Sequence, residues 1–176
     1  NPYISWEYDE MAITASNLCI EAKDGAEVLI CVGDPYVPVL AFAYSSNVTV
    51  RGVTVGHNVE HGYCSGSVLQ YRGVGGITID DCNLYGSGTY GVEARDCSYM
   101  NVRGTEIYEC TYGLVSLYDV SVASFQDCEM HDSGDMAMFS LGAVYNVVFE
   151  NCRIHDNITS AEYDTAFISL GEEYYS

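Results

Sequence analysis

Basic residues are scarce in this sequence. Its 176 residues include six lysine and arginine residues against 25 aspartate and glutamate residues, so the formal net charge is −19 at pH 7. Nucleic acids and anionic membrane surfaces are both bound through basic side chains that neutralise phosphate. We therefore expect no nucleic-acid partner and no membrane insertion, and we note a surplus of carboxylates that could attract cations.

Long apolar runs and helical periodicity are also missing. No run approaches the roughly 18 apolar residues that cross a membrane, and no longer segment repeats its apolar positions with the helical period. The chain opens at Asn1 and Pro2 without the basic residues of a signal peptide. We interpret the chain as a piece of a longer bacterial-type protein, so the missing signal peptide does not exclude secretion or display at the cell surface.

The sequence has eight cysteines but no CxxC pair, which argues against a zinc or redox motif. Cys82, Cys128 and Cys152 occupy equivalent places in segments of alternating apolar residues, where cysteine serves as a small buried side chain. Two disulfides stay open on the sequence alone, namely Cys31–Cys64 and Cys97–Cys110.

A repeat runs through the second half of the chain. The position of Cys82 recurs at Thr105, Cys128 and Cys152, at intervals of 23, 23 and 24 residues. Two places further on, at the same intervals, stand Leu84, Ile107, Met130 and Ile154. A period in the low twenties with alternating apolar residues inside each unit predicts one coil of a parallel β-solenoid per repeat.

Each unit contains three short apolar segments, which predicts three strands per coil. The third segments are residues 92–95, 114–117, 138–141 and 167–170. We predict an all-β solenoid of about six coils over residues 17–170 with no substantial helix, an N-terminal cap or partial coil over residues 1–16, and a frayed tail over residues 171–176. The residues before the Cys82 position, which suit a left-handed turn, are Asp81, Gly104, Asp127 and Asn151.

The repeats resemble those of right-handed parallel β-helix proteins, the pectate-lyase-like superfamily. The resemblance is carried by Ile77-x-Ile79-x-x-Cys82-x-Leu84 and Val147-x-Phe149-x-x-Cys152-x-Ile154-x-x-Asn157. It implies a single-stranded, right-handed helix with a carbohydrate groove along one sheet. The superfamily holds polysaccharide lyases, glycoside hydrolases and non-catalytic surface proteins, so the repeat alone implies no activity. Asp80 and Asp81 are similar to the paired aspartates of polygalacturonases, but the companion Asn-x-Asp, Gly-His-Gly and Arg-x-Lys segments are absent.

The loop after the second strand of each coil carries the main candidate site. Equivalent positions of successive coils stack about 4.8 Å apart. An outward ring column, expected to bind ligand, is therefore predicted from Tyr85, Tyr108, His131 and His155. A carboxylate column beside it is predicted from Glu109, Asp132 and Asp156.

Three stacked carboxylates repel one another, so either their pKa values rise or a cation neutralises them. A Ca²⁺ ion would be held by Asp132, Asp135 and Asp156, with Asn157 completing the shell. Raised pKa values would instead suit Glu109, Asp132 and Asp156 as catalytic groups in sugar chemistry. The third alternative is that each carboxylate caps its turn and faces water.

Other candidates lie outside this loop. Tyr90 and Tyr112 each precede a glycine in consecutive coils, and their rings could stack on sugars or on one another. His57, Glu60 and His61 could hold a transition metal, although a loop brings no automatic convergence. An outward apolar strip, expected to dock a protein partner, a second copy or the rest of a longer chain, is predicted from Leu40, Leu69, Val115, Phe139 and Ile168.

These features favour two functions. The first is a secreted or cell-surface β-helix module that binds carbohydrate or serves structure and adhesion. The second is a polysaccharide lyase or glycoside hydrolase that uses carboxylates in a β-helix groove.

Overall fold

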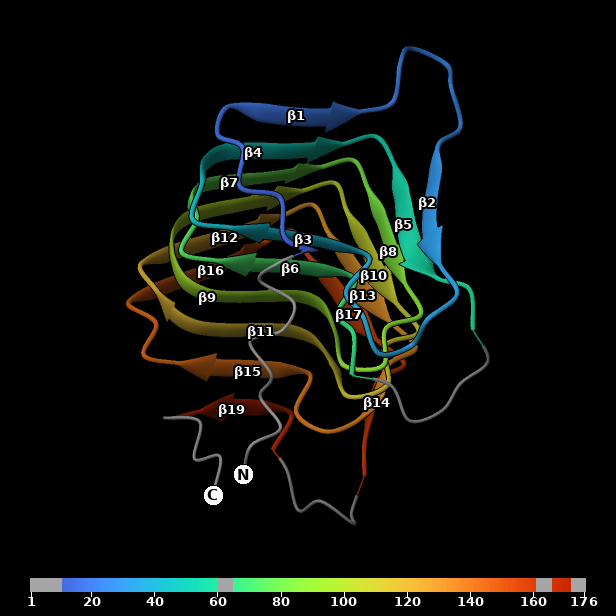
Figure 1. Ribbon diagram of the computed structural model, residues 1–176. Helices are drawn as coiled ribbons and strands as arrows, with labels where there is room; N and C mark the ends of the chain where they lie inside the picture. Colours follow the sequence, from blue (N-terminus) through green and yellow to red (C-terminus); the bar gives the residue numbers. More distant parts are fainter. Residues whose placement is uncertain (1–10, 60–64, 161–165, 172–176) are drawn as a thin grey trace.

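The computed structural model describes residues 11–59, 65–160 and 166–171, and every regular element in these ranges is a β-strand. The strands stack into three faces of a solenoid, and the chain passes from one face to the next within each coil (Figure 1). Neighbouring strands on each face are parallel. Within the described ranges, no helix could cross a membrane.

Each face is a ladder of strands from successive coils. The first face consists of β1 (Leu18–Glu21), β4 (Ser46–Arg51), β7 (Gly75–Asp80), the second half of β9 (Tyr90–Arg103), β12 (Val122–Gln126) and β16 (Asn146–Glu150). The second face consists of β2 (Leu29–Val32), β5 (Thr54–His57), β8 (Asn83–Tyr85), β10 (Glu106–Tyr108), β13 (Glu129–His131) and β17 (Arg153–His155). The third face consists of β3 (Leu40–Ala43), β6 (Leu69–Arg72), the first half of β9, β11 (Gly113–Val120), β15 (Phe139–Gly142) and β19 (Ile168–Leu170). A separate short pair consists of β14 (Gly134–Asp135) and β18 (Ile158–Thr159).

The predicted all-β architecture of stacked parallel strands is confirmed. Residues 47–55 contribute to two strands. Gly52 has a φ of 64°, and the turn at this residue divides the segment into β4 and β5. Residues 1–10 of the predicted cap and residues 172–176 of the predicted tail lie outside the described residues. Ile13, just inside them, forms an isolated bridge with Phe42.

The corners of the coil are made by residues with positive φ. Between the first and second faces, Asp81, Gly104, Asp127 and Asn151 have φ values of 53° to 55°. Asparagine, aspartate and glycine tolerate this backbone better than other residues. The prediction that these residues form the turns is confirmed.

The residue after each of these turn residues points inward and bonds back to the chain. Cys82 Sγ lies 3.4 Å from the carbonyl oxygen of Asp80, and Cys128 Sγ lies 3.2 Å from that of Gln126. The same bond to the carbonyl two residues earlier is made by Cys97, Thr105, Cys110, Ser133 and Cys152. Cysteine here is a small buried group with a weak S–H donor, as the sequence predicted for Cys82.

None of the described cysteines is paired with another described cysteine in a disulfide. Cys97 and Cys110 lie at different corners, and the disulfide left open between them is not formed. Cys31 is also free, whereas Cys64 lies outside the described residues.

The interior of the solenoid is a continuous apolar column, and it overturns one prediction. Leu69, Val115 and Phe139 were expected to point outward, but they are 0–1% exposed and belong to the core. They share the register of inward Val92, so the expected strip was misplaced by one residue. The outward column of the third face instead holds Gln70, Glu93, Ser116, Ser140 and Ser169. Of the other two residues of the predicted strip, Leu40 is half-buried and packs against the core, and Ile168, in β19, is 48% exposed.

Candidate functional site

The predicted ring column exists on the outside of the second face. Tyr85, Tyr108, His131 and His155 end successive strands and are paired in register. Their ring centroids are 5.7, 5.5 and 5.1 Å apart, and adjacent rings are within 19° of parallel. The stacking follows from the fold, because residues at equivalent positions of successive coils must lie one above another.

The faces of these rings are largely occupied by one another. Tyr108 and His131 each have a ring on both sides. At the N-terminal end of the column, a Cβ placed on Gly56 would come within 2.3–2.6 Å of the Tyr85 ring, so that ring lies directly over the glycine. The faces of the inner rings are therefore closed to a ligand.

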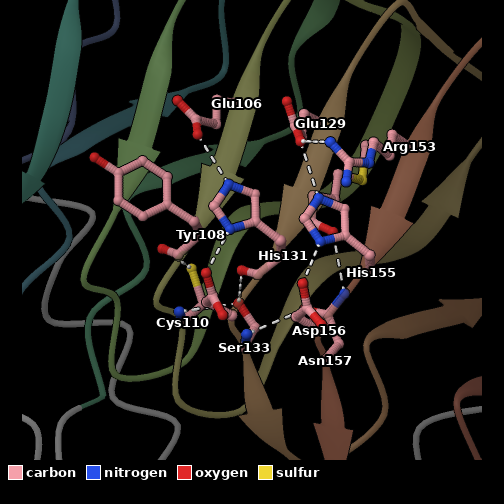
Figure 2. A network of polar contacts seen from close by, with 12 residues as sticks. Glu106, Tyr108, Cys110, Glu129, His131, Ser133, Arg153, His155, Asp156 and Asn157 are labelled. Atoms are coloured by element: carbon pink, nitrogen blue, oxygen red, sulfur yellow. Dashed lines mark hydrogen bonds and ion pairs between the residues drawn. The ribbon is translucent and has the colours of Figure 1, made fainter.

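Each histidine lies between two carboxylates (Figure 2). His131 Nδ1 is 2.7 Å from Asp132 Oδ2, and its Nε2 is 2.8 Å from Glu106 Oε1 on the preceding coil. His155 repeats the arrangement. Its Nδ1 is 2.6 Å from Asp156 Oδ2 and its Nε2 is 2.9 Å from Glu129 Oε1.

The two glutamates were not among the predicted site residues. Glu106 and Glu129 stand two places before Tyr108 and His131 on β10 and β13, so strand alternation puts them on the same outward face. Glu129 also accepts a bond of 3.0 Å from Arg153 Nη1. The alternation of inward and outward residues along each strand could have identified Glu106 and Glu129 from the sequence.

These contacts shift the pKa values of both partners. Burial alone would lower the pKa of His131, but its hydrogen bonds to Glu106 and Asp132 outweigh this effect and raise the pKa above 6.5. The bonds to Asp156 and Glu129 raise the pKa of His155 in the same way. In return, His155 holds the carboxyl pKa values of Glu129 and Asp156 below their ordinary values.

The predicted carboxylate column is a set of turn residues. Glu109, Asp132 and Asp156 have φ values of 54°, 52° and 53°. Asp132 and Asp156 each bond to the histidine that precedes them, whereas Glu109 follows Tyr108 and is exposed. Asp135 lies apart, in β14, with a φ of 122°. In the described residues, no group of three or more histidine, cysteine, aspartate or glutamate side chains is arranged to hold a metal ion.

Asn157, the expected fourth calcium ligand, is used inside the solenoid. Its Oδ1 accepts a bond of 3.0 Å from the Ser133 amide, and its Nδ2 donates to the Met130 carbonyl over 3.1 Å. One coil earlier, Ser133 Oγ accepts from the Cys110 amide over 3.0 Å. This inward ladder fixes the corner that follows the ring column.

The remaining predicted residues lie elsewhere. Tyr90 begins β9, and its ring is next to Gly113 of the following coil, where an added Cβ would meet it at 3.1 Å. Tyr112 is half-buried just before β11. His57 is buried, with Nε2 2.9 Å from the Val37 carbonyl oxygen, and Glu60 and His61 lie outside the described residues.

A second candidate site, not predicted from the sequence, is a groove of about 440 Å³ on the first face. Short polar side chains of successive coils, aligned by strand register, form its floor: Thr49, Thr78, Asn101 and Ser124. At one side, Gly76 lies between Asn47 and Tyr99 of the neighbouring coils.

Asn47, Gly76 and Tyr99 occupy one corner of successive coils, and all three have positive φ. Gly76 has a φ of 81°, and a Cβ there would meet Asn47 Oδ1 at 3.1 Å. Asn47 is held from behind by a 2.9 Å bond from its Nδ2 to Asn17 Oδ1. Tyr99 has a φ of 51°, is 69% exposed and lines the groove. Asn17 and Asn47, at the same corner of the preceding coils, also have positive φ, so the backbone of Tyr99 is that of a regular coil turn.

A charged ladder borders the groove at the ends of the same strands. Arg51 Nε lies 3.0 Å from Asp80 Oδ2, and Arg103 Nη2 lies 3.0 Å from Asp80 Oδ1. Glu21 extends the ladder, 3.8 Å from Arg51. Bonds from Arg103 and Arg51 hold the pKa of Asp80 below 3.8. The two arginines are thus already neutralised by acidic neighbours.

The family follows from both sequence and structure. A family model described as a right-handed beta helix region matches residues 39–168, most of the chain. The chain therefore belongs to the right-handed β-helix family, in agreement with the predicted fold and its handedness. No match was found among curated proteins or among solved structures. The family defines a β-helix module, and any activity has to be argued from the site.

Proposed function

We propose that this β-helix module binds neutral carbohydrate in the groove of the first face. The observation that carries the proposal is the groove itself, with hydroxyl and amide groups along its floor and the exposed Tyr99 ring at its side. Sugar hydroxyls form hydrogen bonds with such short polar groups, and an exposed aromatic ring supplies apolar contact area with little loss of conformational entropy.

Charge favours a neutral ligand over an acidic one. The chain carries a formal net charge of −19 and would repel polyuronates or sulfated glycans. Arg51 and Arg103, the cations that border the groove, are paired with Asp80. No unpaired cation among the groove-lining residues would offset the repulsion of an acidic ligand.

A binding role suits a secreted or cell-surface module that serves adhesion, as expected from the sequence. The ring column of the second face supports the structural part of this role, because its faces stack on one another and its charges pair between coils. Sugar binding by Tyr85, Tyr108, His131 and His155 stays a proposal that would use ring edges. Sugar binding by Tyr90 and Tyr112 likewise stays a proposal.

The test is a neutral-glycan array followed by calorimetry on the glycans retained. Tyr99→Ala should weaken binding by at least about tenfold, the equivalent of roughly 1.4 kcal/mol. Tyr145→Ala is the matched control, because Tyr145 is 83% exposed but does not line the groove. Retention of no neutral glycan, or equal losses in both variants, would contradict the proposal.

Catalysis is the second candidate, favoured by the carboxylate–imidazole contacts of Asp132 and Asp156. Such pairs can exchange protons with a substrate. Release of reducing ends from a polysaccharide by the native chain, lost in Asp132→Asn, Asp156→Asn and Glu109→Gln, would support it. A Ca²⁺ ion at Asp132, Asp135 and Asp156 also stays a proposal. It would have to displace the histidines, so calcium should shift the imidazole resonances of His131 and His155.

A further inference from the structure

Two of the six basic residues of the chain lie side by side on the outward side of the third face. Arg72 of β6 and Arg95 of β9 are paired in register, so their strand positions are about 4.8 Å apart. The other three arginines lie on the first and second faces, where each pairs with an acid. In a chain with a net charge of −19, two adjacent cations mark a surface where an acidic segment can bind.

The two guanidinium groups are held against tyrosine rings on opposite sides. Arg72 Cζ lies 5.7 Å from the centroid of the Tyr44 ring, on the coil before it. Arg95 Cζ lies 4.8 Å from the centroid of the Tyr118 ring, on the coil after it. Such cation–π contacts fix a guanidinium group through its face, whereas carboxylates bind it through the N–H donors in its plane. The two modes of contact are therefore compatible.

The outward column beside the arginines is polar and shielded at its centre. Its acidic residue, Glu93, bonds to Ser67 and to Gln70 of the preceding coil. Ser116 follows Glu93 in this column and is 5% exposed, although its strand position points outward. The solvent-facing side of a sheet is normally open to water. A serine that solvent hardly reaches fits a face that is covered.

We propose that the acidic segment of residues 7–10 docks on the outward side of the third face, with its carboxylates on Arg72 and Arg95. The segment reads Glu-Tyr-Asp-Glu and directly follows Trp6. It lies outside the described residues, and charge and reach together point to this face. Carboxylates bind guanidinium groups through paired hydrogen bonds, so the docked segment neutralises both arginines and covers the polar column beside them. The proposal does not rest on carbohydrate binding.

The segment is within reach of both arginines. Ile13 forms a parallel bridge at the edge of β3, where its carbonyl oxygen accepts a bond of 3.1 Å from the Ala43 amide. Arg72 and Arg95 follow Ala43 by one and two coils, at about 5 and 10 Å. An extended chain spans about 3.3–3.6 Å per residue, so residues 7–10, three to six places before Ile13, can lie about 10 to 20 Å from it.

Trp6 is the only tryptophan of the chain, so its fluorescence reports on this segment alone. Acrylamide quenching of the full chain at low salt, compared with the chain in urea, tests the proposal. The native quenching constant should be severalfold smaller than the constant in urea. Arg72→Glu/Arg95→Glu should raise it toward the urea value, and so should Glu7→Arg/Asp9→Arg/Glu10→Arg. Exposed ion pairs contribute modestly, so replacing two of them by repulsion should lower the docked population by on the order of tenfold.

Combining the two sets of substitutions should restore the native quenching constant, because opposite charges then face each other again. Arg153→Glu is the control, since Arg153 lies on the second face, and it should leave Trp6 as shielded as in the native chain. The acid variant leaves β6 and β9 unchanged, so it decides the question even if the arginine variant does not fold.

Three outcomes would overturn the proposal. The first is native quenching as strong at low salt as in urea. The second is shielding of Trp6 that survives both charge reversals. The third is shielding that appears only as the protein concentration rises, which would assign the face to a second copy of the chain instead.

Discussion

Replacing Gly56 with alanine should break the ring column from its N-terminal end. The new Cβ would lie 2.3–2.6 Å from three atoms of the Tyr85 ring, well inside the about 3.5–4.0 Å at which carbon atoms pack. The φ of Gly56 is not in the left-handed region, so the backbone accepts alanine and the ring has to move. It cannot keep both its position and its contact with Tyr108, whose centroid is 5.7 Å away.

The expected cost follows from three effects. Overpacking at a buried position costs about 1–3 kcal/mol, and loss of the Tyr85–Tyr108 stack costs about 0.5–1.5 kcal/mol. Alanine in a strand recovers about 0.5–1 kcal/mol of backbone entropy relative to glycine. The net prediction for Gly56→Ala is destabilisation by about 2 kcal/mol, read as a lower urea midpoint at an unchanged slope.

Two further variants isolate the clash. Gly75→Ala is the matched control, because Gly75 is also a strand residue without positive φ, and its added Cβ would meet Ser98 Oγ at an ordinary 3.5 Å. It should be neutral or slightly stabilising. In a Tyr85→Ala background the clash is gone, so Gly56→Ala should cost nothing. If Gly56→Ala is as stable as the native chain, or costs as much without the Tyr85 ring, the column is not packed as described.

Two more predictions concern the outer ladder and the corners. Asp80→Asn should destabilise the chain by on the order of 1 kcal/mol at pH 7, since it leaves Arg51 and Arg103 without their shared partner. Because the pKa of Asp80 is lowered on folding, this difference should shrink as the pH falls from about 3.8 through the folded value, and urea unfolding followed from pH 7 down to about pH 2 would show whether it does. Among the described cysteines, Cys19 and Cys31 should react with a thiol reagent in the native state, and Cys82, Cys97, Cys110 and Cys128 only on unfolding. Rapid native labelling of any of these four, resolved by peptide mass, would contradict the corner assignment.

The inward-facing positions made the coil predictable from the sequence. At the first corner a turn residue is followed by a small inward residue, and this combination recurs at Asp81–Cys82 and Asp127–Cys128 with a fixed period. The ring column could be predicted for the same reason. Stacking is a property of the period, so any residue at the position of Tyr85 must lie over its counterpart in the next coil.

The third face was harder to predict because its apolar pattern does not alternate. Leu114, Val115 and Leu117 are all buried, so the sequence of β11 does not reveal which residue begins the inward series. A shift of one residue then moves every side chain to the opposite face. The same shift produced the misplaced apolar strip.

The groove could not be found by looking for chemical motifs, because it is lined by short side chains that only the register of successive coils brings together. The signal available in the sequence was modest. It consisted of short polar residues at Thr49, Thr78 and Asn101, in register on consecutive coils.

The alternating charges of Glu21, Arg51, Asp80 and Arg103 have a consequence for how the chain finds its native pairing. Coils of a solenoid resemble one another, so a strand that skips one neighbour and pairs with the next still buries apolar residues. At this edge such a skip would place Arg51 beside Arg103, or Glu21 beside Asp80, instead of the native opposite pairs. Like charges directly opposite each other in a sheet are destabilising. The alternating charges therefore disfavour a pairing that skips one coil, which the hydrophobic pattern alone would allow.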